Sequence, residues 1–599
     1  MQIKLSKYIA NFMVNQGVKH VFTVTGGGAM HLNDAFGHEE RLECVYNHHE
    51  QACAIAAEGY TRLSGELSLV CVTSGPGGTN AITGVLGGWL DSIPMFVISG
   101  QVKRETTLWS TDVPLRQLGD QEYNIIDSVA PMTKYAQMVT EPEKIRYHLE
   151  KAMYLAMNGR PGPVWLDIPL DVQAAIIETD ELEGFDPEEL KEENPVYDNT
   201  LTAEILNKIK QAKRPVILAG TGIRVAGAQE EFIACIEKLN IPVVTAWNAH
   251  DLLWADHKLF CGKPGTVGTR GGNFVVQNSD LLLVLGCRMN IRIISYNRHG
   301  FAKDAYKIVV DIDKNELRKP TVNVDMPVHA NVKDVMRAIA ESAYKSDNNM
   351  HEKWLQWCRE IDAKYPATRD EHYRQSQPMN PYAFMKEAFR VFDENEVIVC
   401  GNGAACVMTF QAANIKKGQR LFTNSGCAAM GYGFPAAIGA CFARDNKRTI
   451  CIDGDGSFQM NLQELQTVAY NQLNLKIFYL NNNGYHSIRQ TQTNLFQPPL
   501  IGVCDGNGLS FPEAEKIAYA YGIPYIRIDN IEDAEEKVRE AVNMDGPVLC
   551  EIVVDPEQNF EPKLSSKVLP DGKIVSPDLD DMFPFLPREE YEANKKIIL

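Results

Sequence analysis

The residue types best suited to binding a phosphate and its metal ion are a Gly-Asp-Gly-Ser run at 454–457 and an asparagine pair downstream. The surrounding pattern predicts a buried strand at 448–452, a helix at 463–470 and a second strand at 475–480 that ends at Asn481 and Asn482. Oxygen ligands would then stand at the carboxyl ends of two strands, where open α/β sheets bind ligands. An Asp carboxylate and an Asn carbonyl suit a hard cation such as Mg²⁺, which would bridge to a diphosphate. The glycines would let backbone N–H groups approach the phosphates.

Gly-Asp-Gly by itself more often marks an ordinary turn between a strand and a helix. Here the asparagines at the end of the next strand favour the ligand-binding interpretation.

A second candidate site lies in the N-terminal part. Glu50 is expected at the end of a strand, where one carboxylate can point into a cleft, and a helix of small residues follows at 54–62. After a further apolar strand, the run 73–81 contains a Ser-Gly-Pro-Gly turn that opens a helix. Such a turn presents backbone N–H donors to an anion.

Apolar strands alternate with helices along most of the chain, which predicts parallel sheets with crossover helices. We expect an α/β protein with three doubly wound domains at 1–175, 195–345 and 375–556. The acidic stretch 178–199 is interpreted as a linker. Residues 557–599 form a C-terminal tail whose apolar residues Met582, Phe583, Phe585 and Leu586 predict docking on the folded body.

Composition excludes several classes of protein. A net charge of −18 argues against a general nucleic-acid binder, and no apolar run is long enough to cross a membrane. The first residues lack the apolar core of a signal peptide. The 14 cysteines are scattered without a Cys-x-x-Cys pair, which favours buried thiols in a cytoplasmic protein over zinc sites or disulfides.

Several segments in the same order carry a resemblance to a known family. They lie at 49–51, 73–81, 91–95, 99–102, 424–426, 430–431, 435–439, 454–461 and 463–465. Across nearly its whole length the chain resembles the acetolactate synthase group of thiamine-diphosphate (ThDP) enzymes. The resemblance implies a pyrimidine-binding domain, a central domain and a diphosphate-binding domain, in that order, before the tail.

The resemblance also implies roles for single residues. Glu50 would hydrogen-bond the aminopyrimidine of ThDP and promote its activation. Asp455, Asn482 and the backbone carbonyl of Gly484 would hold Mg²⁺. Met430 would keep the cofactor bent. Further contacts with ThDP are expected from Pro76, Asn80, Gly403, Ala404, Ala405, Gly454, Gly456 and Ser457.

Three more residues are expected near the reacting carbon. Gly27 and Gln121 stand in segments that face it in the family. His49 either assists proton transfer or packs beside Glu50.

In acetolactate synthases the middle domain carries FAD. This chain keeps Gly220, Gly222, Arg288, Arg292 and Asp311, and the two arginines could pair with phosphates. However, Asn290-Ile291 replaces the family's acidic pair, and Asn331 stands where Asp is usual. FAD is the expected ligand, although related enzymes bind ADP or acyl-CoA there, or leave the site empty.

The implied reaction is decarboxylation of a 2-oxo acid, with pyruvate as the expected donor, and transfer of the acyl-anion unit to a carbonyl acceptor. Thr491 replaces a family Trp and Asp120 a family Phe, so the acceptor pocket would be wider and more polar. The acceptor is thus either a 2-oxo acid or a keto-sugar nucleotide. The alternative is a 2-oxo-acid decarboxylase that forms no new carbon–carbon bond. A non-catalytic relative is less well supported, because Glu50, Asp455 and Asn482 are intact. In the family the active sites lie between subunits, which implies a homodimer or homotetramer.

Overall fold

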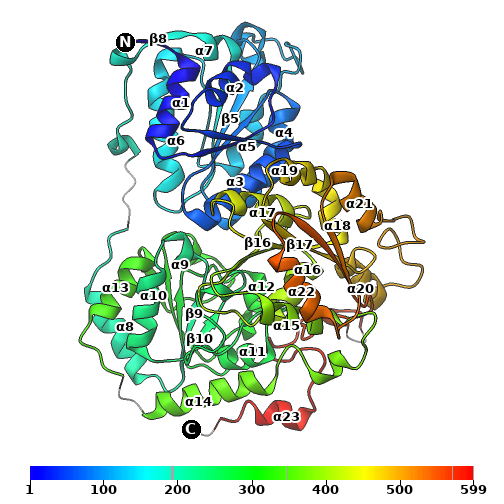
Figure 1. Ribbon diagram of the computed structural model, residues 1–599. Coiled ribbons are helices and arrows are strands. Elements are labelled where there is room, and N and C mark those ends of the chain that lie inside the picture. The colour runs from blue at the N-terminus through cyan, green and yellow to red at the C-terminus, as the bar shows by residue number, and fades with distance from the viewer. Residues whose placement is uncertain (191–194, 347–348, 569–570, 598–599) are drawn as a thin grey trace.

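The computed structural model describes residues 1–190, 195–346, 349–568 and 571–597. Three parallel sheets follow one another along the chain (Figure 1). The first has the order β3-β2-β4-β5-β7-β6. Its strands are β2 (His20–Thr23), β3 (Glu43–Tyr46), β4 (Leu69–Val72), β5 (Phe96–Gln101), β6 (Tyr135–Met138) and β7 (Val164–Pro169). Its main helices are α1 (Leu5–Asn15), α2 (Met30–Gly37), α3 (Glu50–Ser64), α4 (Pro76–Asp91) and α6 (Ile145–Met157).

The central sheet has the order β10-β9-β11-β12-β13. It consists of β9 (Pro215–Ala219), β10 (Val243–Thr245), β11 (Leu281–Leu285), β12 (Tyr306–Asp311) and β13 (Met326–His329). The helices around it are α8 (Thr200–Gln211), α9 (Gly222–Val225), α10 (Gln229–Leu239), α11 (Arg270–Gln277), α12 (Ile291–Ile294) and α13 (Val332–Glu341). The long helix α14 (Asn349–Lys364) then leads to the third sheet.

The third sheet has the order β15-β14-β16-β17-β19-β18. Its strands are β14 (Val397–Cys400), β15 (Arg420–Phe422), β16 (Thr449–Gly454), β17 (Leu475–Asn481), β18 (Tyr525–Ile528) and β19 (Val548–Val553). Its helices include α15 (Pro381–Val391), α16 (Ala404–Ala412), α17 (Gly433–Phe442), α18 (Asp455–Phe458), α19 (Leu465–Tyr470), α20 (His486–Leu495), α21 (Ala514–Tyr521) and α22 (Ala534–Asn543). If the strands of each sheet are counted in chain order, the first and third sheets have the same arrangement. The two outer domains therefore share a topology that their sequences conceal.

The three α/β domains predicted from the sequence are confirmed as a fold class. Strands such as β4 and β11 are buried along their whole length, which explains why they appear as unbroken apolar runs rather than as alternating patterns. The predicted domain boundaries themselves remain predictions. Part of the expected linker, residues 191–194, lies outside the described residues, as do residues 347–348 at the expected end of the second domain.

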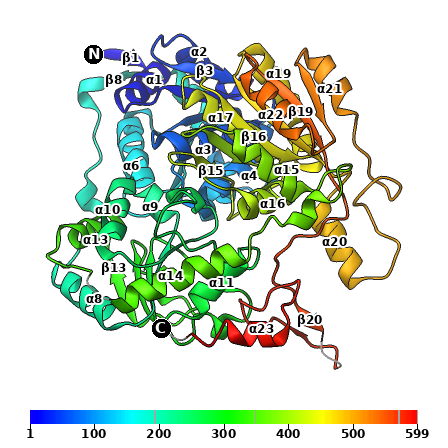
Figure 2. The ribbon, with the colours of Figure 1, turned by 60° about the horizontal axis from the view of Figure 1, so that its bottom comes forward.

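Helices α3 and α17 pack together between the first and third sheets (Figure 2). A Cβ atom on Gly59 would lie 2.4 Å from the backbone oxygen of Ala436, and one on Gly439 would lie 1.8 Å from that of Ala56. The glycines thus allow the two backbones to touch. The central and third sheets are joined in another way, since one apolar cluster contains both Val284 of β11 and Ile452 of β16.

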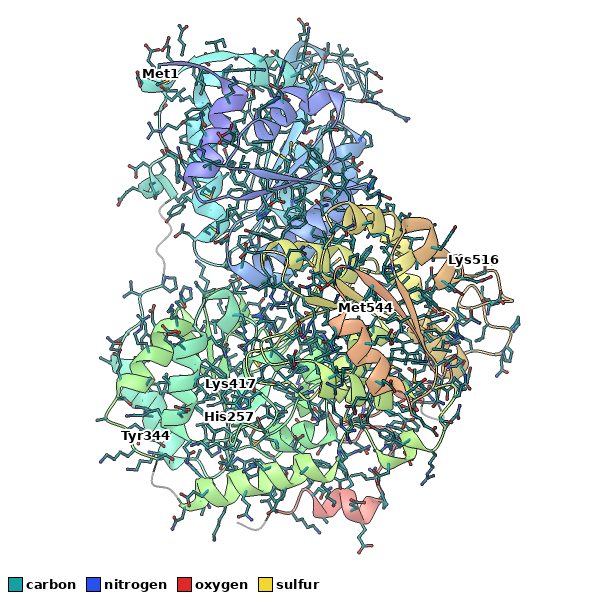
Figure 3. All side chains as sticks on the ribbon, in the orientation of Figure 1. Met1, His257, Tyr344, Lys417, Lys516 and Met544 are labelled. Carbon is teal, nitrogen blue, oxygen red and sulfur yellow. The ribbon has the colours of Figure 1, made fainter. Side chains whose placement is uncertain are left out.

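The C-terminal tail lies across the central domain and ends in α23 (Arg588–Ala593) (Figure 1). Arg270 of α11 donates hydrogen bonds to the carbonyls of Met582 and Pro584. Of the four expected anchors, Met582 is fully buried, whereas Phe583 and Phe585 stay exposed. In Figure 3, Met1 lies at the top of the molecule and Tyr344 at the left edge of its lower part. Within the described ranges, no helix combines the length and the apolar character needed to cross a bilayer.

Candidate active site

The predicted cation ligands meet at the carboxyl edge of the third sheet. β16 and β17 are paired in parallel with Gly454 opposite Leu480, so the residues that follow each strand lie side by side. Asp455 begins α18 and is buried. Its carboxylate accepts hydrogen bonds from the backbone N–H groups of Gly456 at 2.7 Å and Gly484 at 3.0 Å. Burial raises the pKa of Asp455 to about 6, which a bound cation would counteract.

Asn482 supplies the second oxygen of this group. Its Oδ1 atom is buried and has no hydrogen-bond partner among the described residues. A buried acceptor of this kind calls for a bound group, because leaving it unpaired costs free energy. Mg²⁺ in proteins is bound by oxygen ligands such as a carboxylate, an amide oxygen and a peptide carbonyl. The residues present therefore fit the expected cation.

The backbone around these ligands has free space beside it. A Cβ atom placed on Gly454 or on Gly403 would meet nothing within 4 Å. Gly403 has a φ of +90° and precedes α16, so Ala404 and Ala405 present the N-terminal amides of that helix. Ser457 accepts a hydrogen bond from the backbone N–H of Gly431, the residue after Met430. These features together provide room and donors for a diphosphate.

Met430 lies over the Gly-Asp-Gly turn. Its terminal methyl group is 3.3 Å from the position that a Cβ atom of Gly456 would take, and the ring of Tyr485 is 2.3 Å from the same position. Gly456 is therefore needed for close approach as well as for its amide. Tyr485 had no predicted role, although its place directly after Gly484 could have drawn attention to it.

Glu50 is the first residue of α3 and is partly exposed. Its carboxylate accepts a hydrogen bond of 3.0 Å from Asn80 of α4. His49 caps the same helix, because its Nδ1 atom accepts the N–H of Gln51 at 3.0 Å. Of the two roles considered for His49, this contact supports the structural one.

The other N-terminal candidates lie around the start of α4. Pro76 is the first residue of that helix. Gln121 has a φ of +60° and presses against Gly75, where a Cβ atom would lie 2.5 Å from the Gln121 carbonyl oxygen. Gly27, in a short turn at 27–29, has open space beside it. Among the described residues, no hydrogen bond or ion pair joins Glu50 directly to Asp455 or Met430.

The central sheet has a cavity of about 270 Å³ at the carboxyl ends of its strands. Gly222, Arg288 and Asp311 line it, together with Asp91 and Arg160 from the first domain. Burial raises the pKa of Asp311 to about 6. Two of the predicted residues do not line this cavity. A Cβ atom on Gly220 would lie 2.3 Å from the Gly286 oxygen, so this glycine permits strand-end packing, and the Arg292 guanidinium stacks 4.8 Å from the Trp247 ring.

Comparisons with known proteins agree with this arrangement. Models of the thiamine pyrophosphate enzyme N-terminal TPP-binding, central and C-terminal TPP-binding domains match residues 3–125, 202–339 and 401–552. The chain is 30% identical to the acetolactate synthase isozyme 1 large subunit of Escherichia coli (strain K12), over 93% of this chain and 95% of that one. It is 31% identical to a probable acetolactate synthase large subunit of Methanococcus aeolicus, over 93% and 92%. It is 30% identical to the acetolactate synthase large subunit of Lactococcus lactis subsp. lactis (strain IL1403), over 95% and 96%.

The chain belongs to the thiamine pyrophosphate enzymes. Within them it is an acetolactate-synthase-like, ThDP-dependent transferase that acts as a carboligase, which confirms the resemblance found in the sequence.

Besides Tyr485, two further residues of this ThDP enzyme gained no role from the sequence. Glu464 is buried. Its carboxylate accepts hydrogen bonds from the side-chain amide of Asn47 and from the backbone N–H of His48, both at 3.0 Å. It thereby ties the third domain to the segment just before Glu50. The segment 463–465 had been matched to the family, so the signal was present without a function attached.

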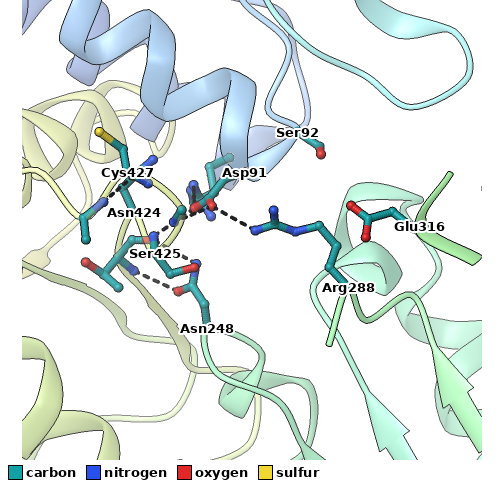
Figure 4. A network of polar contacts seen from close by, with 12 residues as sticks. Asp91, Ser92, Asn248, Arg288, Glu316, Asn424, Ser425 and Cys427 are labelled. Carbon is teal, nitrogen blue, oxygen red and sulfur yellow. Dashed lines mark hydrogen bonds and ion pairs between the residues drawn. The ribbon is translucent and has the colours of Figure 1, made fainter. Parts of the chain in front are cut away.

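Asp91, the last residue of α4, joins all three domains (Figure 4). Its carboxylate accepts the backbone N–H groups of Ser425 at 3.0 Å and Gly426 at 2.8 Å, and pairs with Arg62 at 2.8 Å. Arg288 of the central domain approaches it at 3.8 Å. One buried carboxylate therefore connects the cofactor-binding domains to the wall of the central cavity.

Proposed function

We propose that this enzyme decarboxylates a 2-oxo acid, with pyruvate as donor, and transfers the acyl unit to a carbonyl acceptor with the help of ThDP and Mg²⁺. The observation that carries the proposal is the buried, unpaired Oδ1 atom of Asn482 beside the Asp455 carboxylate at the ends of neighbouring strands. When bound, ThDP supplies the carbon that takes up the acyl group and stabilises the negative charge left by the loss of CO₂.

The chain's own residues hold the cofactor. Asp455, Asn482 and the Gly484 carbonyl bind Mg²⁺, and the open backbone at Gly403 and Gly454 receives the diphosphate. The remaining diphosphate donors come from Ala404, Ala405, Gly456 and Ser457. Met430 would support the bound cofactor. Glu50 would hydrogen-bond the aminopyrimidine and share a proton with it, and Asn80 fixes the direction of the Glu50 carboxylate.

The site is completed by a second copy of the chain. We propose a homodimer as the smallest active unit, with Glu50, Gly27 and Gln121 of one subunit facing Asp455 and Met430 of its partner. Large apolar side chains that are exposed in the single chain support this arrangement. Trp109 is 67% exposed, Phe496 64% and Ile501 74%, all in loops or helix ends near the candidate residues in sequence.

The acceptor is proposed to be more polar than a simple aliphatic 2-oxo acid. Thr491 lies on α20 and is partly exposed, and its hydroxyl donates to the Ser487 carbonyl at 3.0 Å. Asp120 is exposed next to Gln121. A hydroxyl and a carboxylate in place of aromatic side chains favour hydrogen bonds over apolar contact, which suits a keto-sugar nucleotide.

We also propose FAD for the central cavity, with Arg288 near its phosphates and Asp311 near a ribose. Gly222 lines the cavity and supports this assignment, whereas the stacked position of Arg292 argues against a phosphate contact from that residue. Purified enzyme is expected to show flavin absorbance. A protein that is colourless and takes up no added FAD would contradict the assignment.

The decisive experiment is mass spectrometry of products from ¹³C-labelled pyruvate, with ThDP, Mg²⁺ and a panel of acceptors that includes pyruvate, 2-oxobutyrate and keto-sugar nucleotides. Labelled acyl groups on an acceptor are expected. Free labelled acetaldehyde as the main product would instead identify the non-ligating decarboxylase. A strong preference for 2-oxobutyrate over pyruvate would contradict the part assigned to Thr491.

A further inference from the structure

A buried guanidinium lies directly behind the loop that carries the proposed cation ligands. Arg489 belongs to the first turns of α20 and is 8% exposed. Its Nη2 atom donates to the carbonyl oxygen of Asn482 at 2.8 Å, and its Nη1 atom donates to that of Asn483 at 3.4 Å. Both acceptors are backbone atoms of the loop itself.

The loop adopts a conformation that needs external support. Asn483 has a φ of +52° and Gly484 a φ of +143°, two successive residues with left-handed backbone. A non-glycine residue in this region is uncommon and is retained when its surroundings hold it there. On one side, Asp455 accepts the N–H of Gly484 at 3.0 Å. On the other side, Arg489 holds the two preceding carbonyls.

Packing alone does not explain an arginine at this position. The Nε atom of Arg489 is buried without a hydrogen-bond partner among the described residues, which costs free energy. Moreover, a positive charge near a cation site opposes cation binding by Coulomb repulsion. Against these costs, the guanidinium imposes a geometry on the loop, since its planar fork fixes two acceptors at once.

We propose that Arg489 is a positioning residue that holds the loop 482–484 so that the Asn482 Oδ1 atom and the Gly484 carbonyl point at the cation. The inference rests on the proposed ThDP and Mg²⁺ site and adds the means by which the ligands are oriented. Supporting contacts behind metal ligands commonly change metal affinity about 10–100-fold when they are removed.

For Arg489→Met, Coulomb repulsion and the proposed positioning role predict opposite changes in cation affinity. Removal of a nearby positive charge would strengthen cation binding, whereas loss of the two hydrogen bonds would weaken it. The measurement is Mn²⁺ binding, followed by the electron paramagnetic resonance signal of free Mn²⁺ in the presence of saturating ThDP. We expect about 10–100-fold weaker binding in Arg489→Met and an intermediate effect in Arg489→Lys, which keeps the charge but has one compact donor group. At saturating Mn²⁺, kcat should return towards the wild-type value.

Arg270→Met is the matched control, because Arg270 is also buried and also donates to two backbone carbonyls, but on α11. Its Mn²⁺ affinity should stay at the wild-type value. Wild-type or tighter affinity in folded Arg489→Met would overturn the inference, and so would equal weakening in Arg270→Met. If Arg489→Met does not fold, Arg489→Lys decides, and unchanged affinity there also overturns it. A wild-type protein that binds no Mn²⁺ with ThDP would instead contradict the proposed function.

Discussion

At the scale of single residues, the site contains two carboxylates in contrasting surroundings. Glu50 is partly exposed and has a neutral partner, Asn80, whereas Asp455 is buried among backbone N–H groups. The first arrangement leaves a carboxylate free to contact a cofactor ring. The second holds a carboxylate rigidly for a metal ion. These two environments support separate proposed roles for two residues of similar chemistry.

Glu50→Gln should bind ThDP but activate it poorly. The glutamine can still accept the hydrogen bond from Asn80, so the local structure should survive. It lacks the carboxylate that would share a proton with the cofactor, a loss that typically costs about 10²–10⁴-fold in rate. Exchange of the C2 proton of bound ThDP, measured by NMR, checks this, with calorimetry as the control for binding. Wild-type exchange would remove Glu50 from the activating role.

A second residue-scale prediction concerns Asp167 of β7. This fully buried carboxylate accepts hydrogen bonds from Ser99 at 2.6 Å and Gln101 at 3.0 Å, and burial raises its pKa to about 7. In the unfolded chain the pKa is about 3.9. The folded protein therefore binds a proton more readily, which stabilises it at low pH, and this contribution is lost as the pH rises through about 7.

Asp167→Asn should accordingly lose less stability than the wild type between about pH 4 and about pH 7, by roughly 1.4 kcal/mol for each unit of pKa shift that is removed. Urea midpoints across this range provide the measurement. Parallel pH curves for the two proteins would show that Asp167 does not titrate there.

At the scale of elements, strand ends and helix starts place nearly every candidate residue. Asp455 follows β16, Asn482 follows β17, Glu50 starts α3 and Pro76 starts α4. Parallel sheets bring such positions to one edge. The packing of α3 on α17 then determines how the first domain sits against the third.

Gly439→Ala should destabilise the contact between α3 and α17. The added methyl group would lie 1.8 Å from the Ala56 oxygen, so the two helices must move apart. Overpacking of this kind costs about 1–3 kcal/mol. Thermal unfolding provides the measurement. Gly37→Ala in α2 is the control, because its added atom would lie at an ordinary 3.4 Å from the Tyr46 hydroxyl. Equal melting temperatures of the two variants would contradict the prediction.

At the scale of the whole molecule, Asp91 and Glu464 hold the three domains in one arrangement. Each carboxylate is buried and accepts N–H groups from another domain. The α3–α17 contact and the shared apolar cluster add to these links.

Active sites shared between subunits can be tested by complementation. Glu50→Gln and Asp455→Ala should each be nearly inactive alone. When both are produced together, half of the dimers are mixed, and each mixed dimer has one site with both native residues. Activity of about one quarter of the wild type is then expected. The separately purified variants, mixed without subunit exchange, are the control. No recovery in verified mixed dimers would place each complete site within one chain.

The sequence by itself determined the three α/β domains and the strand-end positions of the proposed cation ligands, because these depend on local patterns. Unbroken apolar runs mark strands such as β11, and Asp455 and Asn482 stand directly after the strands that carry them. Likewise, the family resemblance pointed to Gly222 and Asp311, and both line the central cavity.

Only the tertiary structure decided contacts between segments far apart in the chain. Arg292 has the spacing of a phosphate ligand but stacks on Trp247, and Gly220 serves close packing against Gly286. The contacts of Asp91, Glu464 and Arg489 could not be predicted from the sequence for the same reason. Each acts by hydrogen bonding to backbone atoms, and a backbone N–H or carbonyl leaves no signature in the identity of the residue that carries it.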